Sequence, residues 1–284
     1  MLVKGLFCWF LLRKKRNYVI TFAVTIHSGL PNLRNYSVLR LEIFWKDSNL
    51  PDTMKKYTHI YFDLDRTLWD FEANALETFQ DLFEKYKLQQ IFDSFEAFHK
   101  TYQKHNEQLW KDYRDQKISK QDLRNRRFEL TLDEVNIEDK HLAQQLGDEY
   151  IALSPLKTRL FPGTLDVLDY LSAKQYRLHI ITNGFNEVQF VKLKNSKLDQ
   201  YFSKVITSEN AGAQKPRPEI FHYALSSVHA KKHESLMIGD DLSGDILGAQ
   251  KYGIDQVFCN FVGHQHQERP TFEIESISEL KNIL

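Results

Sequence analysis

The sequence predicts an α/β fold in which a parallel β-sheet is interrupted by an inserted helical domain. Three short apolar runs, His59–Phe62, Leu178–Ile181 and Leu236–Ile238, have the composition of buried strands. Single helical segments separate the runs in the second half of the chain, and strands joined in this way pair in parallel through right-handed crossovers. Each run is followed at once by polar residues, at the place where open α/β sheets build their active sites.

The composition is that of a folded protein with a large core. The chain has 284 residues, of which 42% are hydrophobic and 13% aromatic, and these values argue against global disorder. Lys+Arg and Asp+Glu both number 38, so there is no basic excess of the kind that binds a nucleic acid polymer or an anionic membrane. Cys8 and Cys259 are the only cysteines. No disulfide framework is therefore expected, and a cytoplasmic location fits best.

The first 53 residues differ from the rest of the chain. A basic cluster, Arg13–Arg16, separates two apolar stretches, Leu2–Leu12 and Tyr18–Ile26. Neither stretch approaches the ~20 residues of a membrane-spanning helix, and a cluster that follows the first apolar stretch reverses the order of a signal peptide. Met54 lies just before the first core strand. We interpret residues 1–53 as an N-terminal extension outside the fold, and we expect no membrane attachment.

The helical insertion is predicted over residues 71–154, between two core segments, 54–70 and 155–284. Apolar residues at three- and four-residue steps mark its helices. A first helix is expected from Phe71 to Tyr86, a second from Phe95 to Tyr113 and a fourth from Leu142 to Leu153, while Ser119 and Asp122 have the spacing of a capping box that begins a third.

Helical and strand patterns alternate again after Pro155. The expected strands are 57–63 (before the insertion), 177–182, 204–207, 235–238 and 256–259, and the expected helices are 164–173, 186–195, 218–229, one from Ser243, and 277–284. This alternation extends the parallel sheet to the end of the chain.

Asp63 and Asp65 follow the first strand two residues apart, with Thr67 beyond them. If the extended geometry continues, both carboxylates point to the same side of the sheet. A nucleophile and an acid/base need that placement around one phosphorus atom. Asp63 is the candidate nucleophile, and Asp65 would protonate the leaving oxygen and then deprotonate the attacking water. An isolated motif of this kind is also typical of a solvated turn.

Thr182, Asn183 and Gly184 end the second run, and Lys215 precedes Pro216 further along the chain. A hydroxyl and successive backbone N–H groups can hold phosphate oxygens, and an ammonium can offset their charge. Turns of this composition are also common for purely structural reasons, and a lone lysine before a proline is usually exposed.

Asp240, Asp241 and Asp245 crowd carboxylates at the end of the third run. Mg²⁺ favours a few carboxylates completed by water and phosphate oxygens. We expect Asp63, Asp240 and the backbone carbonyl of Asp65 to hold the ion, with Asp241 or Asp245 supporting Lys215 or a metal-bound water. An acid at a helix N-terminus is an equally good interpretation of Asp241.

Taken in order, these four motifs resemble those of the haloacid dehalogenase-like hydrolase superfamily, over essentially all of residues 57–284. The resemblance implies a Rossmann-like parallel-sheet core, a helical cap of the C1 type at the insertion, and hydrolysis through an aspartyl phosphate with Mg²⁺. The dehalogenase branch lacks the second aspartate, so the presence of Asp65 favours a phosphatase.

Longer segments resemble the YjjG-type 5′-nucleotidases, which act on pyrimidine nucleoside monophosphates, including noncanonical ones. The similar segments are Asp63–Phe71, Asn106–Trp110, Thr182–Phe185 and Lys215–Phe221. Arg66 departs from that family, in which an acidic residue is usual at this position. The resemblance implies a small phosphorylated partner and makes Asn106 and Trp110 candidates for contact with the base.

Spacing supports those two residues only in part. Asn106, Trp110 and Tyr113 fall on one face of the second expected helix, where an aromatic surface and an amide could hold a pyrimidine. Aromatic residues at helical spacing are more often core. A sugar-phosphate phosphatase or a phosphomutase therefore stays open, as does a catalytically silent binding protein, and either a monomer or a small homo-oligomer is compatible with the sequence.

Overall fold

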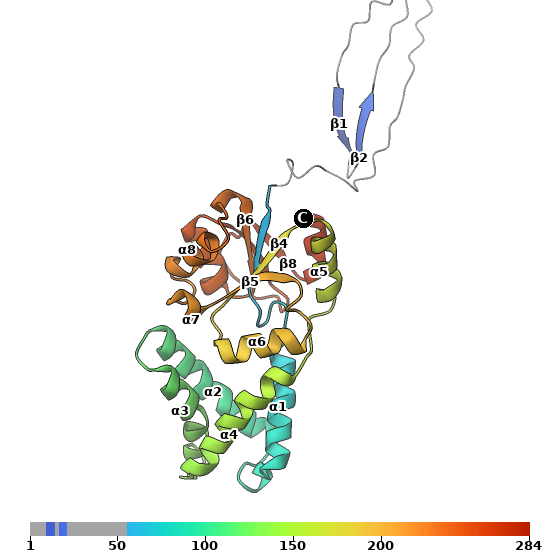
Figure 1. Cartoon of the computed structure of the whole chain (residues 1–284). Coiled ribbons are helices and arrows are strands. Elements are labelled where there is room, and N and C mark those ends of the chain that lie inside the picture. Colours follow the sequence, from blue (N-terminus) through green and yellow to red (C-terminus); the bar gives the residue numbers. More distant parts are fainter. Residues whose placement is uncertain (1–9, 15–16, 22–55) are drawn as a thin grey trace, which may run out of the picture. The chain divides into compact units, whose positions relative to one another are not determined.

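A computed structural model of the protein describes residues 10–14, 17–21 and 56–284 (Figure 1). The chain divides into two units, residues 1–55 and 56–284. In the first unit, β1 (Phe10–Lys14) and β2 (Asn17–Thr21) pair antiparallel. Apart from these two strands, the predicted extension, including Cys8, lies outside the described residues. Among the described residues, no helix is both long enough and apolar enough to cross a membrane.

The second unit contains a six-stranded parallel sheet, which confirms the predicted fold class. Its strand order is β5-β4-β3-β6-β7-β8. The strands are β3 (His59–Phe62), β4 (Arg177–Thr182), β5 (Phe202–Thr207), β6 (Ser235–Gly239), β7 (Asp255–Cys259) and β8 (Phe272–Ile274). Because β3 lies between β4 and β6, the three strands that carry the motifs are neighbours.

The register of these strands brings the motifs to one edge of the sheet. Phe62 at the end of β3 pairs with Ile180 of β4 and with Ile238 of β6. Asp63 therefore leaves the sheet one residue before the level at which β4 and β6 reach Thr182 and Asp240. The sheet thus fixes the motifs relative to one another before any side-chain contact forms.

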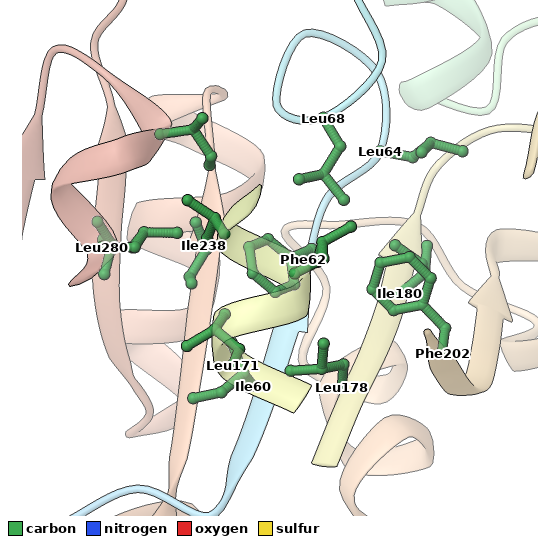
Figure 2. Close-up of a cluster of buried hydrophobic side chains, with 14 of the residues drawn as sticks. Ile60, Phe62, Leu64, Leu68, Leu171, Leu178, Ile180, Phe202, Ile238 and Leu280 are labelled. Carbon is green, nitrogen blue, oxygen red and sulfur yellow. The ribbon is translucent and has the colours of Figure 1, made fainter. Parts of the chain in front are cut away.

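The helices of the core are α5 (Thr164–Ala173), α6 (Asn186–Asn195), α7 (Ser208–Ala211), α8 (Pro218–Ser226), α9 (Gly248–Tyr252) and α10 (Leu280–Ile283). Strand residues alternate between two apolar clusters. Ile60 and Phe62 pack with α5 and α10 on one face of the sheet (Figure 2), whereas Tyr61 packs with α8 and α9 on the other. Both faces of the sheet are covered, as near-continuous apolar strands require.

Four longer helices form the segment between β3 and β4 (Figure 1), namely α1 (Phe71–Lys85), α2 (Phe95–Arg114), α3 (Lys120–Asp133) and α4 (Lys140–Leu153). Each begins at a side chain that accepts a backbone N–H bond, from Asp70, Ser94, Ser119 and Asp139. Such caps satisfy N–H groups that have no partner within the helix. The helices share an apolar cluster of their own around Phe79.

Four details differ from the prediction. The strand β8 was not expected, because three residues are too few to show a period-two pattern. The helix expected from Ser243 is a π-helical turn, η5 (Leu242–Leu247), which runs into α9. The helix expected to reach His229 ends at Ser226, and the one expected over residues 277–284 is a 3₁₀ turn followed by the short α10.

A shortened chain that begins at Met54 is expected to fold and to keep its activity. The described residues of the two apolar clusters of the sheet begin at Tyr57, so the shortened chain retains them all. Thermal unfolding and phosphatase assays of the shortened and full-length chains would check this, with equal midpoints and rates as the expected result. Insolubility or inactivity of the shortened chain would show that residues 1–53 belong to the fold.

Candidate active site

A cavity of about 330 Å³ lies at the strand ends, between the sheet and the helical segment. The strand ends and the turns that follow them contribute Asp63, Asp65, Thr182, Asn183, Gly184, Lys215, Asp240, Asp241 and Asp245 to its lining. The helices contribute Asn106 and Trp110, among others. The candidate catalytic, metal-binding and substrate-binding residues named here therefore line one cavity, whereas Tyr113 does not.

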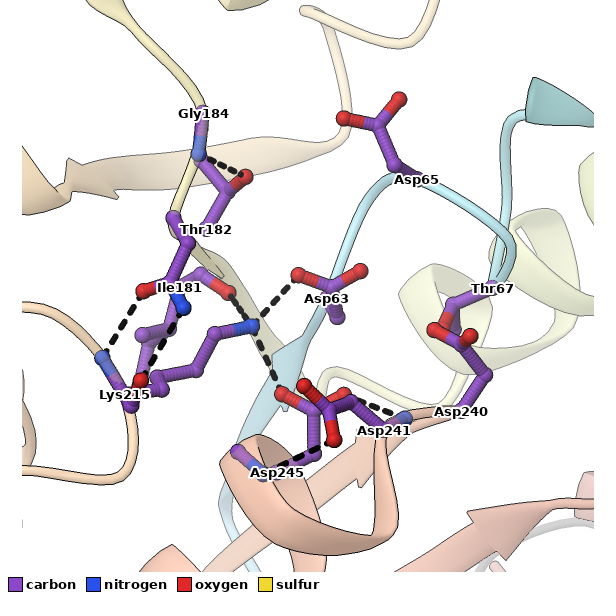
Figure 3. A network of polar contacts seen from close by, with 12 residues as sticks. Asp63, Asp65, Thr67, Ile181, Thr182, Gly184, Lys215, Asp240, Asp241 and Asp245 are labelled. Carbon is purple, nitrogen blue, oxygen red and sulfur yellow. Dashed lines mark hydrogen bonds and ion pairs between the residues drawn. The ribbon is translucent and has the colours of Figure 1, made fainter. Parts of the chain in front are cut away.

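Lys215 is the centre of the polar network at the strand ends (Figure 3). Its Nζ lies 2.5 Å from Oδ1 of Asp63 and 2.6 Å from Oδ1 of Asp245, and it donates to the carbonyl of Ile181 at 2.9 Å. The residue is only 3% exposed. An ammonium so deeply buried needs charged partners, so Lys215 is not the exposed lysine that was the alternative interpretation of its sequence context.

The Asn183 side chain fixes the backbone of Lys215. Its Oδ1 accepts from the N–H of Lys215 at 2.8 Å, and its Nδ2 donates to the carbonyl of Lys215 at 3.1 Å. These paired bonds tie the turn after β4 to the loop that carries the lysine. The Asn183 amide is thus engaged within the protein, which leaves its backbone as the part available to a ligand.

Asp245 and Asp241 have separate structural roles. Asp245 is fully buried; its Oδ1 pairs with Lys215 and its Oδ2 accepts from the N–H of Asp241 at 3.1 Å. Asp241 instead caps the turn η5, because its Oδ1 accepts from the N–H groups of Ser243 and Gly244. Of the two residues expected to support Lys215, Asp245 is the one in contact with it.

Three carboxylates crowd together beside Lys215. Asp63, Asp240 and Asp245 each offer an oxygen, and these atoms lie within 4.8 Å of one another. Burial raises the pKa of Asp63 to about 7, although the charge of Lys215 opposes the shift. Burial likewise raises the pKa of Asp240 and of Asp245 to about 7. For Lys215, burial would lower the pKa, but Asp245 and Asp63 outweigh it and the pKa rises.

This cluster fits a divalent cation. Three carboxylates beside one ammonium leave an excess of negative charge when all three are ionised. An all-oxygen donor set suits Mg²⁺. Thr67 also contacts this cluster, because its hydroxyl donates to Oδ1 of Asp240 at 3.3 Å.

Asp65 belongs to a second polar group, held by helix α6. Its Oδ1 lies 2.5 Å from Nζ of Lys192, and its Oδ2 accepts from Nε2 of Gln189 at 2.8 Å. The same Nε2 lies 2.7 Å from Oγ1 of Thr182, which also accepts from the N–H of Gly184 at 3.0 Å. The carboxylate of Asp65 is thus held apart from the cluster around Lys215 (Figure 3) and close to Thr182.

Sequence reasoning missed Gln189 and Lys192. Both were placed in a connecting helix, yet both are buried and line the cavity. Their three-residue spacing on a helix that starts directly after Thr182–Gly184 puts them on one face above that turn. The start of their helix just after this turn is the sequence feature that could have identified them as site residues. Lys192 also lies 4.2 Å from the centroid of the Trp69 ring, so the ion pair with Asp65 is shielded on one side by an aromatic surface.

Arg66, the residue that departs from the nucleotidase pattern, turns its guanidinium away from the nucleophile. Its Cζ lies 4.3 Å from the centroid of Phe71, and its Nη2 pairs with Glu72 at 2.7 Å. Its charge still reaches the cluster, because it helps to lower the pKa of Asp240 against the effect of burial.

The helical side of the cavity is aromatic. Trp110 stacks on Phe185, with ring centroids 5.6 Å apart and planes inclined by 19°. Trp110 therefore faces the catalytic loops and does not belong to the apolar cluster around Phe79. Lys120 lies 4.3 Å from the centroid of Phe185 and pairs with both Glu187 and Glu209. Asn106 is half-buried, and its Oδ1 is 3.5 Å from the Tyr102 hydroxyl, a long contact that leaves the amide available.

The family model of haloacid dehalogenase-like hydrolases matches residues 60–259. Pyrimidine 5′-nucleotidase PynA of Streptococcus pneumoniae is 34% identical, over 80% of this chain and 97% of that protein. Pyrimidine 5′-nucleotidase YjjG of Escherichia coli is 32% identical, over 81% of this chain and 98% of that protein. A glyceraldehyde 3-phosphate phosphatase of Methanothermobacter thermautotrophicus is 31% identical, over 79% and 98%.

A solved structure has the same fold over the same region. The crystal structure of the HAD-hydrolase YfnB of Bacillus subtilis, bound to magnesium, superimposes with a TM-score of 0.72 at 30% identity. The match covers 81% of this chain and 99% of that one. The sequence matches and the structural match thus cover about the same share of the chain.

Replacing Gly239 by alanine is expected to break the contact between Asp245 and Lys215. A Cβ at position 239 would lie 2.1 Å from Oδ2 of Asp245, a separation that no side chain tolerates. Breaking a buried ion pair costs about 3–5 kcal/mol, so we expect a loss of that order in the free energy of unfolding, together with loss of activity.

Gly147→Ala is the matched control for this substitution. Its Cβ would meet neighbours at ordinary distances of 3.6 and 3.7 Å inside α4, where alanine favours the helix by about 1 kcal/mol. Denaturant unfolding of both variants measures the difference. Equal stability of Gly239→Ala and the natural protein would contradict the packing described for Asp245.

Proposed function

The chain belongs to the haloacid dehalogenase-like hydrolases, and on that premise we propose that it hydrolyses phosphate monoesters, with pyrimidine nucleoside 5′-monophosphates as its substrates. The observation that carries the proposal is the buried Asp63, held by Lys215 and facing a cavity with aromatic walls. The resemblance stated from the sequence motifs is confirmed by the family match and by the two nucleotidase relatives.

Asp63 acts as the nucleophile in this proposal. One of its oxygens bonds to phosphorus while the bond from phosphorus to the ester oxygen breaks. Asp65, which must enter this step protonated, gives its proton to that leaving oxygen. Asp65 then takes a proton from water as the water oxygen bonds to phosphorus. The bond between phosphorus and Asp63 breaks, inorganic phosphate leaves, and both carboxyl groups return to their starting states.

Thr182 and Lys215 bind and neutralise the phosphoryl group. The hydroxyl oxygen of Thr182 already faces two donors, Gly184 N–H and Gln189 Nε2. Its own proton is therefore left to donate to a phosphate oxygen. The backbone N–H of Asn183 lies beside it at the end of β4, whereas that of Gly184 donates to Thr182. The ammonium of Lys215 offsets the charge that gathers at Asp63.

Asp63 and Asp240, with the backbone carbonyl of Asp65, are the residues that we propose to hold Mg²⁺, and Asp245 supports them through Lys215. The bound ion supplies charge neutralisation and polarises the phosphoryl oxygens. The carboxylate crowding described above and the magnesium in the YfnB structure support this assignment.

Substrate choice rests on the helical side of the cavity. A volume of about 330 Å³ suits a small ligand, and the aromatic rings of Trp110 and Phe185 suit a flat base. The balanced charge of the chain and its near lack of cysteine favour a small metabolite in the cytoplasm over a nucleic acid polymer. Because one relative is a glyceraldehyde 3-phosphate phosphatase, a sugar phosphate is the alternative substrate class.

A panel of phosphorylated metabolites tests the proposed substrate class. We expect UMP, dUMP and dTMP to have higher kcat/KM values than hexose and triose phosphates. Asn106→Ala should raise KM for these nucleotides while sparing phenyl phosphate, which has no base for the amide to contact. If sugar phosphates are hydrolysed faster than every pyrimidine nucleotide, the protein is a sugar phosphatase and the nucleotidase proposal is wrong.

The acid/base role of Asp65 predicts a dependence on the leaving group. Asp65→Asn cannot protonate the ester oxygen, so formation of the phosphoenzyme should slow most for alkyl phosphates and least for p-nitrophenyl phosphate, by about 10²–10⁴-fold in the former case. Burst kinetics across a series of leaving groups measure this step. An equal loss for every leaving group would argue against the role.

Removal of divalent cations is expected to silence the enzyme. EDTA followed by gel filtration should abolish phosphate release, and added Mg²⁺ should restore it, because Asp63, Asp240 and Asp245 leave an excess of negative charge in the site. Full activity in exhaustively chelated buffer would remove the metal from the mechanism.

A further inference from the structure

Arg127 on α3 is a buried cation that lines the cavity and has no ion-pair partner among the described residues. The residue is 8% exposed. Its Nε is fully buried, and within the described part of the chain no hydrogen-bond acceptor lies within reach of it. It is a polar side chain more than nine-tenths buried, at the edge of a site that binds substrate in the function proposed above.

The other buried or half-buried cations of the cavity are paired. Lys215 lies against Asp63 and Asp245, Lys192 against Asp65, Lys120 against Glu187 and Glu209, and Arg124 against Asp148. Arg127 differs from all of these. The lysines at the strand ends thus have ion-pair partners, as do Lys120 and Arg124, whereas Arg127 has none among the described residues.

The neighbours of Arg127 are aromatic and neutral. Its Cζ lies 5.4 Å from the centroid of the Tyr150 ring. Burial raises the pKa of the Tyr102 phenol, although Arg127 itself acts to lower it, and burial raises the pKa of Tyr150 as well. Both phenols are thus uncharged at neutral pH, and neither supplies a counter-charge. The buried Nε–H of Arg127 has no acceptor among the described residues, which is costly, and a ligand oxygen placed in the cavity would offset that cost.

We propose that Arg127 is a specificity-determining residue that donates hydrogen bonds to a carbonyl oxygen of the pyrimidine ring. This inference rests on the proposed function. In the proposed function the phosphate is held by Thr182 at the end of β4 and by Lys215 from the loop before α8, whereas Arg127 comes from α3. The part of the substrate that lies toward the helices is the base, and its ring carbonyls are planar acceptors that suit a guanidinium. Asn106 on α2 lines the same cavity and would contact the same ring.

The test compares kcat/KM for UMP, ribose 5-phosphate and phenyl phosphate in one preparation of each variant. Arg127→Met keeps the long apolar stem and removes every donor, and Arg127→Lys keeps the charge but loses the planar fork. Hydrogen bonds to a charged group are worth about 1.5–3 kcal/mol. We therefore expect Arg127→Met to lose about 10- to 100-fold on UMP, mainly through KM, with ribose 5-phosphate and phenyl phosphate within about twofold of the natural enzyme. The lysine variant should recover part of the loss.

Arg126→Met is the matched control, because Arg126 is the adjacent residue on the same helix and is exposed. It should leave all three substrates unchanged. The ratio of UMP to phenyl phosphate turnover within one sample does not depend on the folded fraction, so a partly unfolded Arg127→Met protein still gives a decisive ratio.

Two results would overturn the role of Arg127. The first is an equal loss on all three substrates, which would mean a contact with the phosphate or a purely structural role. The second is a loss on ribose 5-phosphate as large as that on UMP, which would place the contact at the sugar. If the natural enzyme itself fails to prefer UMP to ribose 5-phosphate, the proposed nucleotidase fails first, and that outcome is visible before any variant is made.

Discussion

The ammonium of Lys215 lies between the buried carboxylates of Asp63 and Asp245, and the geometry of the whole site depends on this contact. It links the ends of β3 and β6 to a loop that follows β5, and Asn183 fixes the lysine backbone from the end of β4. The contact is possible because the register of β4, β3 and β6 ends these strands at one level. Because Lys215 pairs with Asp63 and Asp245, the nearby carboxylate of Asp240 has no ammonium partner in this cluster, which is why we propose a divalent cation at this place.

Charge is distributed differently on the two sides of the cavity. At the strand ends, the carboxylates of Asp63, Asp240 and Asp245 outnumber the ammonium of Lys215 beside them, and the proposed metal would offset that excess. On the helical side, Arg127 has no ion-pair partner among the described residues, and its guanidinium lies against the Tyr150 ring. In the function proposed above, the first side would bind the phosphate and the second a neutral, flat group rich in hydrogen-bond acceptors. The contacts of Lys120 with Glu187 and Glu209 join the two sides.

The parallel sheet, the four inserted helices and the residues at the strand ends could be predicted from the sequence. Each apolar run predicts a buried strand, and the residue that follows it, Asp63, Thr182 or Asp240, predicts a site residue in the adjacent position. It was not sufficient for residues whose role depends on tertiary contact. Lys192 and Gln189 have an ordinary helical pattern, and only packing of α6 against the turn after β4 brings them to Asp65. Lys215 and Trp110 were identified as candidates by their motifs, although an exposed lysine and a core aromatic were the alternatives, and in the folded chain both line the cavity. The strand β8 is too short to produce any pattern.

The most direct test of the account is the chemical identity of the intermediate. In Asp65→Asn mixed with p-nitrophenyl phosphate and Mg²⁺, the good leaving group departs without an acid, but no base activates the water that would release the phosphate. Rapid quenching in acid followed by peptide mass spectrometry should then find a phosphoryl group on the peptide that contains Asp63, sensitive to hydroxylamine as an acyl phosphate is, and Asp63→Asn should lack it. Turnover by Asp63→Asn, or a phosphoryl group attached to any other residue, would contradict the assignment of Asp63 as the nucleophile.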